Sequence, residues 1–396
     1  MSLLRNSRRR FFPDLTFTAA VYAPGVLFVS CSEDRFCIFD PVSLKKTSFK
    51  VEGSSRCVTV DYARAQTNTF LSGDFDGIVR LWDIRQPRRP ASVSEAGRDV
   101  LHKGATFSTA AISPDARFVC AGSCAISINK KKRKRTKKSL PSKRRRGVND
   151  VDNPNADGDD DSSNDDDTSP AYILCWDTRQ FGRPLYILDD IHSDHVNHVT
   201  FDPSSNSHRL LSCADDGLLC VADFDAANDD RLIEVFNAEG QINYCGFLNR
   251  LLPSESPSGV FAFDNMRSHF SAWPLTPADA PEGFETPPAW RRLTAPKMAK
   301  VLLTATSLPG QVVGSQPAVC LVSTRPMKED IRLSIATPQG SQLLAKHRLF
   351  KRTPEPVECD PFYAEFLSVP EATKSTFDLL VVGRHSVNRM EASLSK

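Results

Sequence analysis

The sequence predicts an all-β fold built from about seven copies of a four-stranded unit. The first observation is a hairpin pattern from Phe70 to Arg85, in which a short apolar strand is followed by Asp76-Gly77 and an alternating strand, Ile78 to Trp82. We read Asp76-Gly77 as a primed turn, because Gly accepts the positive φ that such a turn needs. The second observation is that the pattern recurs at 26–40, 172–177 and 210–223. A single hairpin of this size is marginal in water, so the copies must shield one another.

Aromatic-Asp pairs end the repeats and set their spacing. They fall at Phe39-Asp40, Trp82-Asp83 and Trp176-Asp177, with Ala222-Asp223 as a degraded version. The first two pairs are 43 residues apart and the last two are 46 apart. A period of about 40 to 45 residues with a Trp-Asp signature resembles the WD-repeat β-propeller family. That resemblance implies a ring of four-stranded blades that serves as a scaffold, and it brings no catalytic residues.

The repeats can be followed in order along the chain. Five repeats are expected at about 16–51, 56–93, 106–177, 192–236 and 242–273. Further strand-like segments at 301–306, 318–323, 331–336, 362–367 and 377–383 are assigned to two degenerate blades. We therefore predict one propeller domain over residues 14–128 and 171–393, with six blades as the alternative count. In the last blade, 387–392 is the expected third strand.

Two charged segments fall outside the repeats. Residues 129–170 interrupt the third repeat between its second and third strands, first basic and then acidic. This segment lacks the apolar residues needed to offset its ordering entropy, so we predict a disordered insertion. Residues 1–13 are predicted to be a basic, mobile N-terminal tail. They are also the only N-terminal segment that could complete the last blade.

Composition and motifs exclude several classes of function. The formal net charge of the 396 residues is only +2, and the excess basic residues belong to the insertion. The eleven cysteines are odd in number and mostly lie in apolar runs, which predicts reduced thiols in an intracellular protein. No secretory signal, membrane-spanning run, phosphate-binding loop or catalytic motif is apparent. We expect no enzyme activity, cofactor, small-molecule substrate or membrane attachment.

By the family resemblance, a His, a Ser, the turn Asp and the Trp of a repeat form a buried hydrogen-bond network. The fourth repeat has His192, Ser212 and Asp216, but Ala222 replaces its Trp. His192, His195 and His198 would share one face only on a helix, and here they enter a strand, so we predict no metal site. The predicted structural positions are Ser72, Asp76, Gly77, Trp82, Asp83, Trp176, Asp177, His192, Ser212, Asp216, Gly217 and Asp223.

The insertion carries two basic clusters separated by a short spacer, the layout of a bipartite nuclear import signal. The clusters are Lys130, Lys131, Lys132, Arg133, Lys134 and Arg135, then Lys143, Arg144, Arg145 and Arg146. An import receptor is the expected partner, and the nucleus, including the nucleolus, is the expected location. A solvated linker and a cytoplasmic protein form the alternative. RNA or histone contact through the insertion also remains open, although the acidic tract competes with phosphate for the same cations.

Arg85 and Arg179 occupy the same place after two Trp-Asp pairs. This resembles the W-D-x-R box by which some WD-repeat proteins dock on the adaptor of a cullin–RING ubiquitin ligase. Residues 171–250 are also similar to the family subgroup of WD repeat-containing protein eighty-nine. We predict a non-enzymatic nuclear scaffold that binds an unnamed protein partner. The alternatives are a ligase substrate receptor and a ribosome-assembly or chromatin-associated factor.

Overall fold

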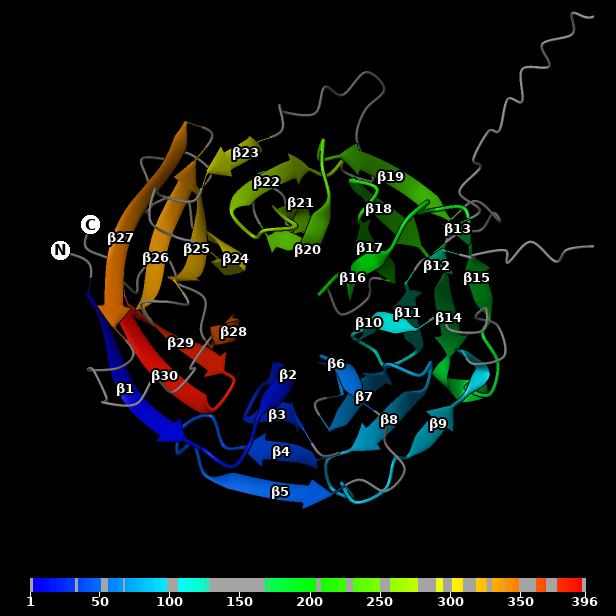
Figure 1. Ribbon diagram of the computed structural model, residues 1–396, viewed down its shortest axis with the longest axis horizontal. Helices are drawn as coiled ribbons and strands as arrows, with labels where there is room; N and C mark the ends of the chain where they lie inside the picture. The colour runs from blue at the N-terminus through cyan, green and yellow to red at the C-terminus, as the bar shows by residue number, and fades with distance from the viewer. Residues whose placement is uncertain are drawn as a thin grey trace, which may run out of the picture.

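A computed structural model shows seven four-stranded antiparallel sheets arranged as blades around a ring (Figure 1). This confirms the predicted all-β propeller and the count of seven. The structure describes residues 3–32, 35–50, 56–66, 68–97, 106–124, 126–127, 168–169, 171–203, 208–225, 231–249, 257–276, 290–294, 301–308, 318–325, 330–337, 339–348, 361–367 and 376–393.

The strands of each blade follow one another from the centre of the ring outward. Blades 1 to 3 are β2 (Phe17–Ala23), β3 (Val26–Cys31), β4 (Arg35–Phe39) and β5 (Lys46–Lys50); β6 (Cys57–Tyr62), β7 (Thr69–Asp74), β8 (Val79–Asp83) and β9 (Ser92–Ser94); and β10 (Phe107–Ile112), β11 (Phe118–Ser123), β14 (Ile173–Asp177) and β15 (Tyr186–Leu188). Blades 4 and 5 are β16 (Val196–Phe201), β17 (Arg209–Ala214), β18 (Leu218–Asp223) and β19 (Leu232–Asn237), then β20 (Ile242–Asn249), β21 (Pro257–Asp264), β22 (His269–Pro274) and β23 (Trp290–Thr294). Blade 6 is β24 (Val301–Leu308), β25 (Ala318–Arg325), β26 (Asp330–Thr337) and β27 (Gly340–Arg348), and β28 (Pro361–Phe366), β29 (Thr376–Gly383) and β30 (Ser386–Ser393) belong to blade 7.

The hydrophobic core is divided among the contacts between neighbouring blades. Seven clusters of buried residues are present in the described chain, and each joins side chains of two adjacent blades. Between blades 1 and 2, for example, the rings of Phe28 and Phe70 lie 4.8 Å apart and those of Phe36 and Trp82 lie 5.2 Å apart. Each sheet therefore buries its apolar faces against its neighbours, as the repeat pattern requires.

The N-terminal segment closes the ring. Strand β1 (Leu3–Phe11) pairs antiparallel with β30, from Leu3 opposite Ser393 to Phe11 opposite Ser386. It is thus the fourth and outermost strand of blade 7, with Leu4 buried and Arg8, Arg9 and Arg10 exposed. The prediction of a mobile tail for residues 1–13 is wrong over this strand. Its Arg residues face solvent on an edge strand, where charge discourages pairing with other chains.

The two Asp-Gly hairpins form turns, but with a different geometry from the predicted one. The N–H of Gly77 donates to the carbonyl of Asp74 at 3.2 Å, and the N–H of Gly217 donates to the carbonyl of Ala214 at 3.2 Å. The glycines have φ of 82° and 80°, while Asp76 and Asp216 have no positive φ. With Asp and Gly as the two central residues, a type I′ turn needs positive φ at both and a type II′ turn needs it at the Asp. The glycine therefore occupies the last position of a four-residue turn.

The charged insertion leaves blade 3 where the sequence predicts, between its second and third strands, β11 and β14. A two-residue ladder at its base pairs β12 (Ile126–Ser127) with β13 (Thr168–Ser169), so residues 168 and 169 have strand structure. The rest of the predicted 129–170 segment, with its import-signal residues, lies outside the described residues.

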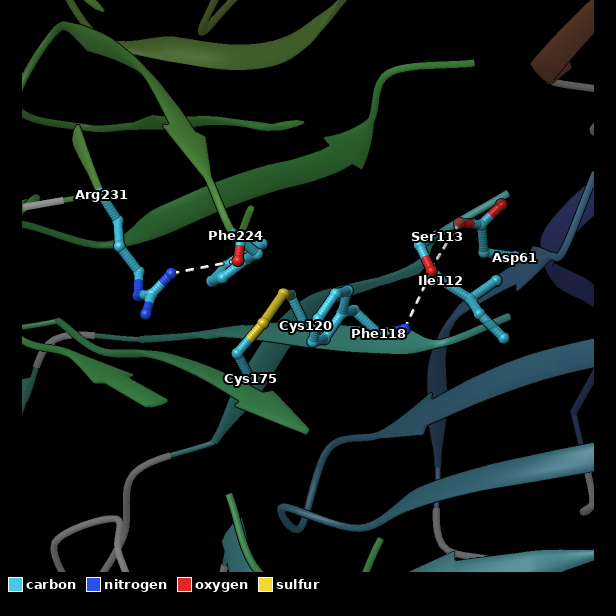
Figure 2. Close-up of a disulfide and its surroundings, with 8 residues drawn as sticks. All are labelled: Asp61, Ile112, Ser113, Phe118, Cys120, Cys175, Phe224 and Arg231. Carbon is cyan, nitrogen blue, oxygen red and sulfur yellow. Dashed lines mark hydrogen bonds between the residues drawn. A yellow bond between two sulfur atoms is a disulfide. The ribbon is translucent and has the colours of Figure 1, made fainter. Parts of the chain in front are cut away.

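One pair of cysteines is joined, which corrects the expectation of reduced thiols throughout. Cys120 on β11 forms a disulfide with Cys175 on β14, with the two Cα atoms 4.3 Å apart (Figure 2). The residues face each other directly in the strand pairing, which brings their sulfur atoms together. Because the insertion separates the two cysteines in sequence, no local pattern reveals this pairing. The other described cysteines are free: Cys31, Cys37, Cys57, Cys124, Cys213, Cys220, Cys245 and Cys320.

Candidate functional site

The centre of the ring holds a cavity of about 340 Å³. The innermost strands of six blades line it, those of blades 1 to 5 and blade 7, together with Arg267 from the turn between β21 and β22. Its polar and aromatic lining residues include Tyr22, Asp61, Tyr62, Arg64, His198, Thr200, Asn243, Tyr244, Arg267, Tyr363 and Glu365. Binding sites are typically lined by aromatic rings with a few charged groups beside them.

The cavity has two distinct ends, because all innermost strands run the same way through the ring. We call the face where these strands begin the entry face; it also carries the second turn of each blade, as the hydrogen bond from Phe75 to the Arg56 carbonyl shows. Arg267 lies in such a turn. Arg64 follows the end of β6, so it belongs to the opposite, exit face, as does Glu365 near the end of β28.

Two carboxylic acids lie toward the exit face. Burial raises the pKa of Asp61 to about 6, against the hydrogen bonds that its carboxylate accepts from the N–H groups of Ile112, at 3.0 Å, and Tyr62, at 2.8 Å. Figure 2 shows how Asp61 thereby joins blade 2 to Ile112 of blade 3. Burial likewise raises the pKa of Glu365, and the charge of Arg64 opposes that rise. Arg64 is therefore the nearby countercharge of this end.

A tyrosine links the two blades at the closure of the ring. The Tyr363 hydroxyl accepts a hydrogen bond from the Tyr22 N–H at 2.9 Å, so blade 7 is tied to blade 1 at the cavity wall. The same hydroxyl lies 3.5 Å from Glu365 Oε2. Burial places the pKa of Tyr363 well above its ordinary value, so the hydroxyl stays protonated and can donate to that carboxylate.

The entry end is built around Arg267. Its guanidinium lies 5.3 Å from the centre of the Tyr244 ring, and its Nε donates to Asn243 Oδ1 at 2.6 Å. The imidazole of His198 packs against the same ring at 4.3 Å. Burial, and then the charge of Arg267, lower the pKa of His198 to about 3, so this imidazole is neutral near pH 7. One cation and a stack of neutral rings therefore form this end of the cavity.

The three histidines considered as metal ligands face different partners. His192 contacts Ser212 Oγ through Nε2 at 2.8 Å and Asp216 Oδ2 through Nδ1 at 3.0 Å. His195 Nε2 lies 3.4 Å from Cys124 Sγ, and His198 Nδ1 lies 3.7 Å from Cys245 Sγ. In the part of the chain that the structure describes, no three His, Cys, Asp or Glu side chains are grouped to hold a metal ion.

The residues of blade 4 that were predicted to be structural lie close together inside the blade. His192 and Ser212 are buried, and Asp216 also accepts hydrogen bonds from the N–H groups of Leu218 and Ser193. Gly217 ends the turn and Asp223 ends β18, while Ala222 fills the place of the Trp with a small buried side chain. The hydrogen bonds run from Ser212 through His192 to Asp216, which is the order of a hydrolase triad. The imidazole and the hydroxyl are buried within the blade.

Blades 2 and 3 differ in how they satisfy their tryptophans. Trp82 Nε1 donates to Ser72 Oγ at 2.9 Å, with both side chains buried. At the equivalent place in blade 3, Ala121 replaces the serine, as the pairing of Val119 with Trp176 shows. Among the residues described, nothing accepts a hydrogen bond from Trp176 Nε1. Apolar packing, including a 6.2 Å edge contact with Phe107, therefore holds this ring.

Blade 2 contains a buried ion pair that the sequence analysis missed. Arg80 Nη1 contacts Asp74 Oδ2, and the two residues are only 4% and 0% exposed. Asp76 lies beyond it in the turn that Gly77 ends. The signal for this pair is the Asp-x-x-x-x-x-Arg spacing across a hairpin, which places both side chains at one end of the second and third strands.

Arg85 and Arg179 do project from equivalent positions, but their guanidinium groups are already engaged. Arg85 Nε and Nη2 contact the Asp83 carboxylate at 2.9 and 2.5 Å. Arg179 forms the same fork with Asp177, within the short 3₁₀ turn η1 (Thr178–Gln180). Hydrogen bonds from these arginines lower the pKa of Asp83 and of Asp177 to about 2. The side chains of Arg85 and Arg179 are 71% and 69% exposed, so both remain accessible to a partner.

Comparison with known proteins agrees with the geometry. Residues 182–223 match the family model described as WD domain, G-beta repeat. A 61-residue stretch is 40% identical to the WD repeat-containing protein 89 homolog of Dictyostelium discoideum, and 100 residues are 29% identical to protein transport protein sec31 of Schizosaccharomyces pombe. These stretches cover 15% and 23% of this chain, but only 17% and 8% of the two relatives.

The seven-bladed ring with its Trp-Asp hairpins defines a β-propeller built from repeats. Together with the matched repeat at residues 182–223, this architecture supports a WD-repeat β-propeller. Proteins of this family are generally non-enzymatic and mediate protein–protein interactions. No helix in the described part of the chain has the length and hydrophobicity to cross a membrane.

Proposed function

We propose that this protein is a non-enzymatic nuclear scaffold that holds a segment of a partner protein in the central cavity. The observation that carries the proposal is the cavity itself, with a volume of about 340 Å³ and a lining of tyrosines and charged side chains. Such groups act as anchors at protein interfaces, where a few aromatic and Arg residues supply most of the binding energy. An extended segment with one or two side chains reaching inward fits a cavity of this size.

The proposal predicts that filling the cavity abolishes capture of the partner. Thr200 lies on β16 and lines the cavity, so Thr200→Tyr should occupy part of its volume. Val235 is 47% exposed on β19 of the same blade, so Val235→Tyr adds the same side chain outside the cavity. Affinity purification with mass spectrometry should recover the partner with wild type and Val235→Tyr, and at least tenfold less with Thr200→Tyr. Equal recovery by all three, with matching thermal midpoints, would contradict the proposal.

Nuclear location is a separate part of the proposal, carried by the sequence of the insertion. Deleting residues 130–146 removes both basic clusters, and blade 3 should still fold because the insertion joins two strands at their ends. We expect the fluorescent fusion to move from the nucleus to the cytoplasm. Substitution of Arg8, Arg9 and Arg10 by Thr, which removes exposed charge elsewhere, is the control. Unchanged nuclear fluorescence in the deletion variant would defeat the import proposal.

A cullin–RING substrate receptor is the second candidate, favoured by the equivalent, exposed positions of Arg85 and Arg179. Docking would require each guanidinium to exchange its own Asp for a carboxylate of the adaptor. Adaptor recovered with wild type but lost from the Arg85→Ala/Arg179→Ala variant would support this role.

The third candidate is an RNA-associated factor that contacts RNA through the insertion. Salt-sensitive RNA recovery that survives deletion of residues 129–170 would count against the insertion as the contact.

A further inference from the structure

Arg267 has a strained backbone at the place where blades 2 and 4 use glycine. Its N–H donates to the carbonyl of Asp264 at 2.7 Å, the same turn contact that Gly77 and Gly217 make in blades 2 and 4. Its φ is 49°, in the left-handed region. For a residue with a Cβ this conformation is less favourable than the right-handed one. The turn would form more easily with glycine. An arginine at this strained position therefore suggests that its guanidinium has a function.

The charge of Arg267 has no carboxylate to balance it within the described chain. Its neighbours are Asn243 Oδ1 and the ring of Tyr244, both neutral. Asp264, at the start of the same turn, is hydrogen-bonded to Ser268 and His269. His198 adds no negative charge, and Asp61 and Glu365 lie toward the exit face with Arg64. As far as the described residues go, the entry end of the cavity therefore carries one uncompensated, half-buried cation.

A cation held away from water without a counterion is costly, and a bound anion removes that cost. Only Nε of the guanidinium has a hydrogen-bond acceptor among the described residues, at Asn243. The outer nitrogen atoms remain as donors, in the planar arrangement that suits a carboxylate or a phosphate. The Tyr244 ring beneath the guanidinium holds it in place over the cavity.

We propose that Arg267 anchors an anionic side chain, a carboxylate or a phosphorylated residue, of the partner segment that occupies the cavity. This inference rests on the proposed function and names the chemistry of its ligand. The anion binds at the entry face, because Asp61 and Glu365 repel it from the exit end. The partner is thereby expected to present an acidic or phosphorylated residue at the tip of the inserted segment.

The test uses the full chain, with inorganic phosphate and acetate as probes at constant ionic strength. Modification of Arg267 by phenylglyoxal, followed by mass spectrometry, reports directly on its guanidinium. We expect an anion that binds there to slow this modification at least threefold in wild type and in Arg64→Gln, the matched control at the opposite end. Protection by phosphate alone would indicate a phosphorylated partner residue, and protection by both probes would admit a carboxylate. No protection by either probe at 50 mM would overturn the proposal.

Partner capture separates this inference from the proposed function. Arg267→Gly keeps the left-handed turn and removes the charge, so we expect at least tenfold less partner with this variant and partial recovery with Arg267→Lys. The thermal midpoint of Arg267→Gly should not fall in proportion to this loss of capture, because glycine relieves the strain of the turn. Full capture by Arg267→Gly with loss by Thr200→Tyr would overturn the anion anchor and leave the cavity function standing. Full capture by both variants would overturn the cavity function itself.

Discussion

Deletion of residues 2–12 is expected to lower the free energy of unfolding by about 4 kcal/mol or more, because it removes the strand that completes blade 7. Strand β1 pairs with β30 over eight residue pairs, and each net hydrogen bond contributes about 0.5–1.5 kcal/mol. Burial of Leu4, only 4% exposed, adds about 2 kcal/mol. Chemical denaturation of the purified protein measures the loss, and an insoluble deletion product would agree with it.

The control for this deletion keeps the strand and removes its charge. Arg8, Arg9 and Arg10 are exposed, so replacing all three by Thr should change the free energy of unfolding by no more than about 1 kcal/mol. Threonine is also well suited to a strand. An unfolding midpoint that the 2–12 deletion leaves unchanged would show that this segment is a dispensable tail after all.

Replacing Asp330 by Asn is expected to cost about 3–5 kcal/mol, because it removes the charge of a buried carboxylate that pairs with two buried arginines. Arg325 Nη2 lies 2.9 Å from Asp330 Oδ2 and Arg332 Nε lies 3.3 Å from Oδ1. The three residues are 9%, 2% and 1% exposed for Arg325, Arg332 and Asp330. The measurement is again denaturant unfolding at pH 7. The matched control is Asp378→Asn, whose pair with Arg389 is partly exposed at 30% and 23%, and which should cost less than about 1 kcal/mol.

The ion pairs of Asp330 also predict that stability depends on pH. Burial alone would raise the pKa of Asp330, but hydrogen bonds from Arg325 and Arg332 outweigh it and lower the pKa below its ordinary value. A carboxylate with a lowered pKa in the folded state stabilises fully above its unfolded pKa of about 4. That contribution is lost as the pH falls through the folded value. The difference between wild type and Asp330→Asn should therefore shrink in acid, and a constant difference would argue against the ion pair.

The sequence reveals the ring better than it reveals the closure or the cavity. Hairpins such as Phe70–Arg85 are local, so their turn residues and alternating strands can be recognised directly. Strand β1 cannot be recognised in that way, because its partner lies at the other end of the chain and its three arginines look like a solvated tail. The Cys120–Cys175 disulfide is hidden for a similar reason, since the register of β11 against β14 spans the insertion.

The cavity residues escape notice because the inner strands carry no distinctive local pattern. Tyr244 and His198 are half-buried strand residues like many others in the chain, and only closure of the ring brings them to a shared space. Arg267 is different in one respect. It stands where the equivalent turns of blades 2 and 4 have glycine, so comparison of the repeats within this one chain could have singled it out.

The pairing of the first strand with the last has a consequence for biosynthesis. Leu3 is synthesised 390 residues before its partner Ser393. The nascent chain must therefore keep an unsatisfied edge while the residues between β1 and β30 are made, and such edges promote aggregation. We expect the polypeptide to depend on a chaperone that shelters this open β-structure until β30 has been made.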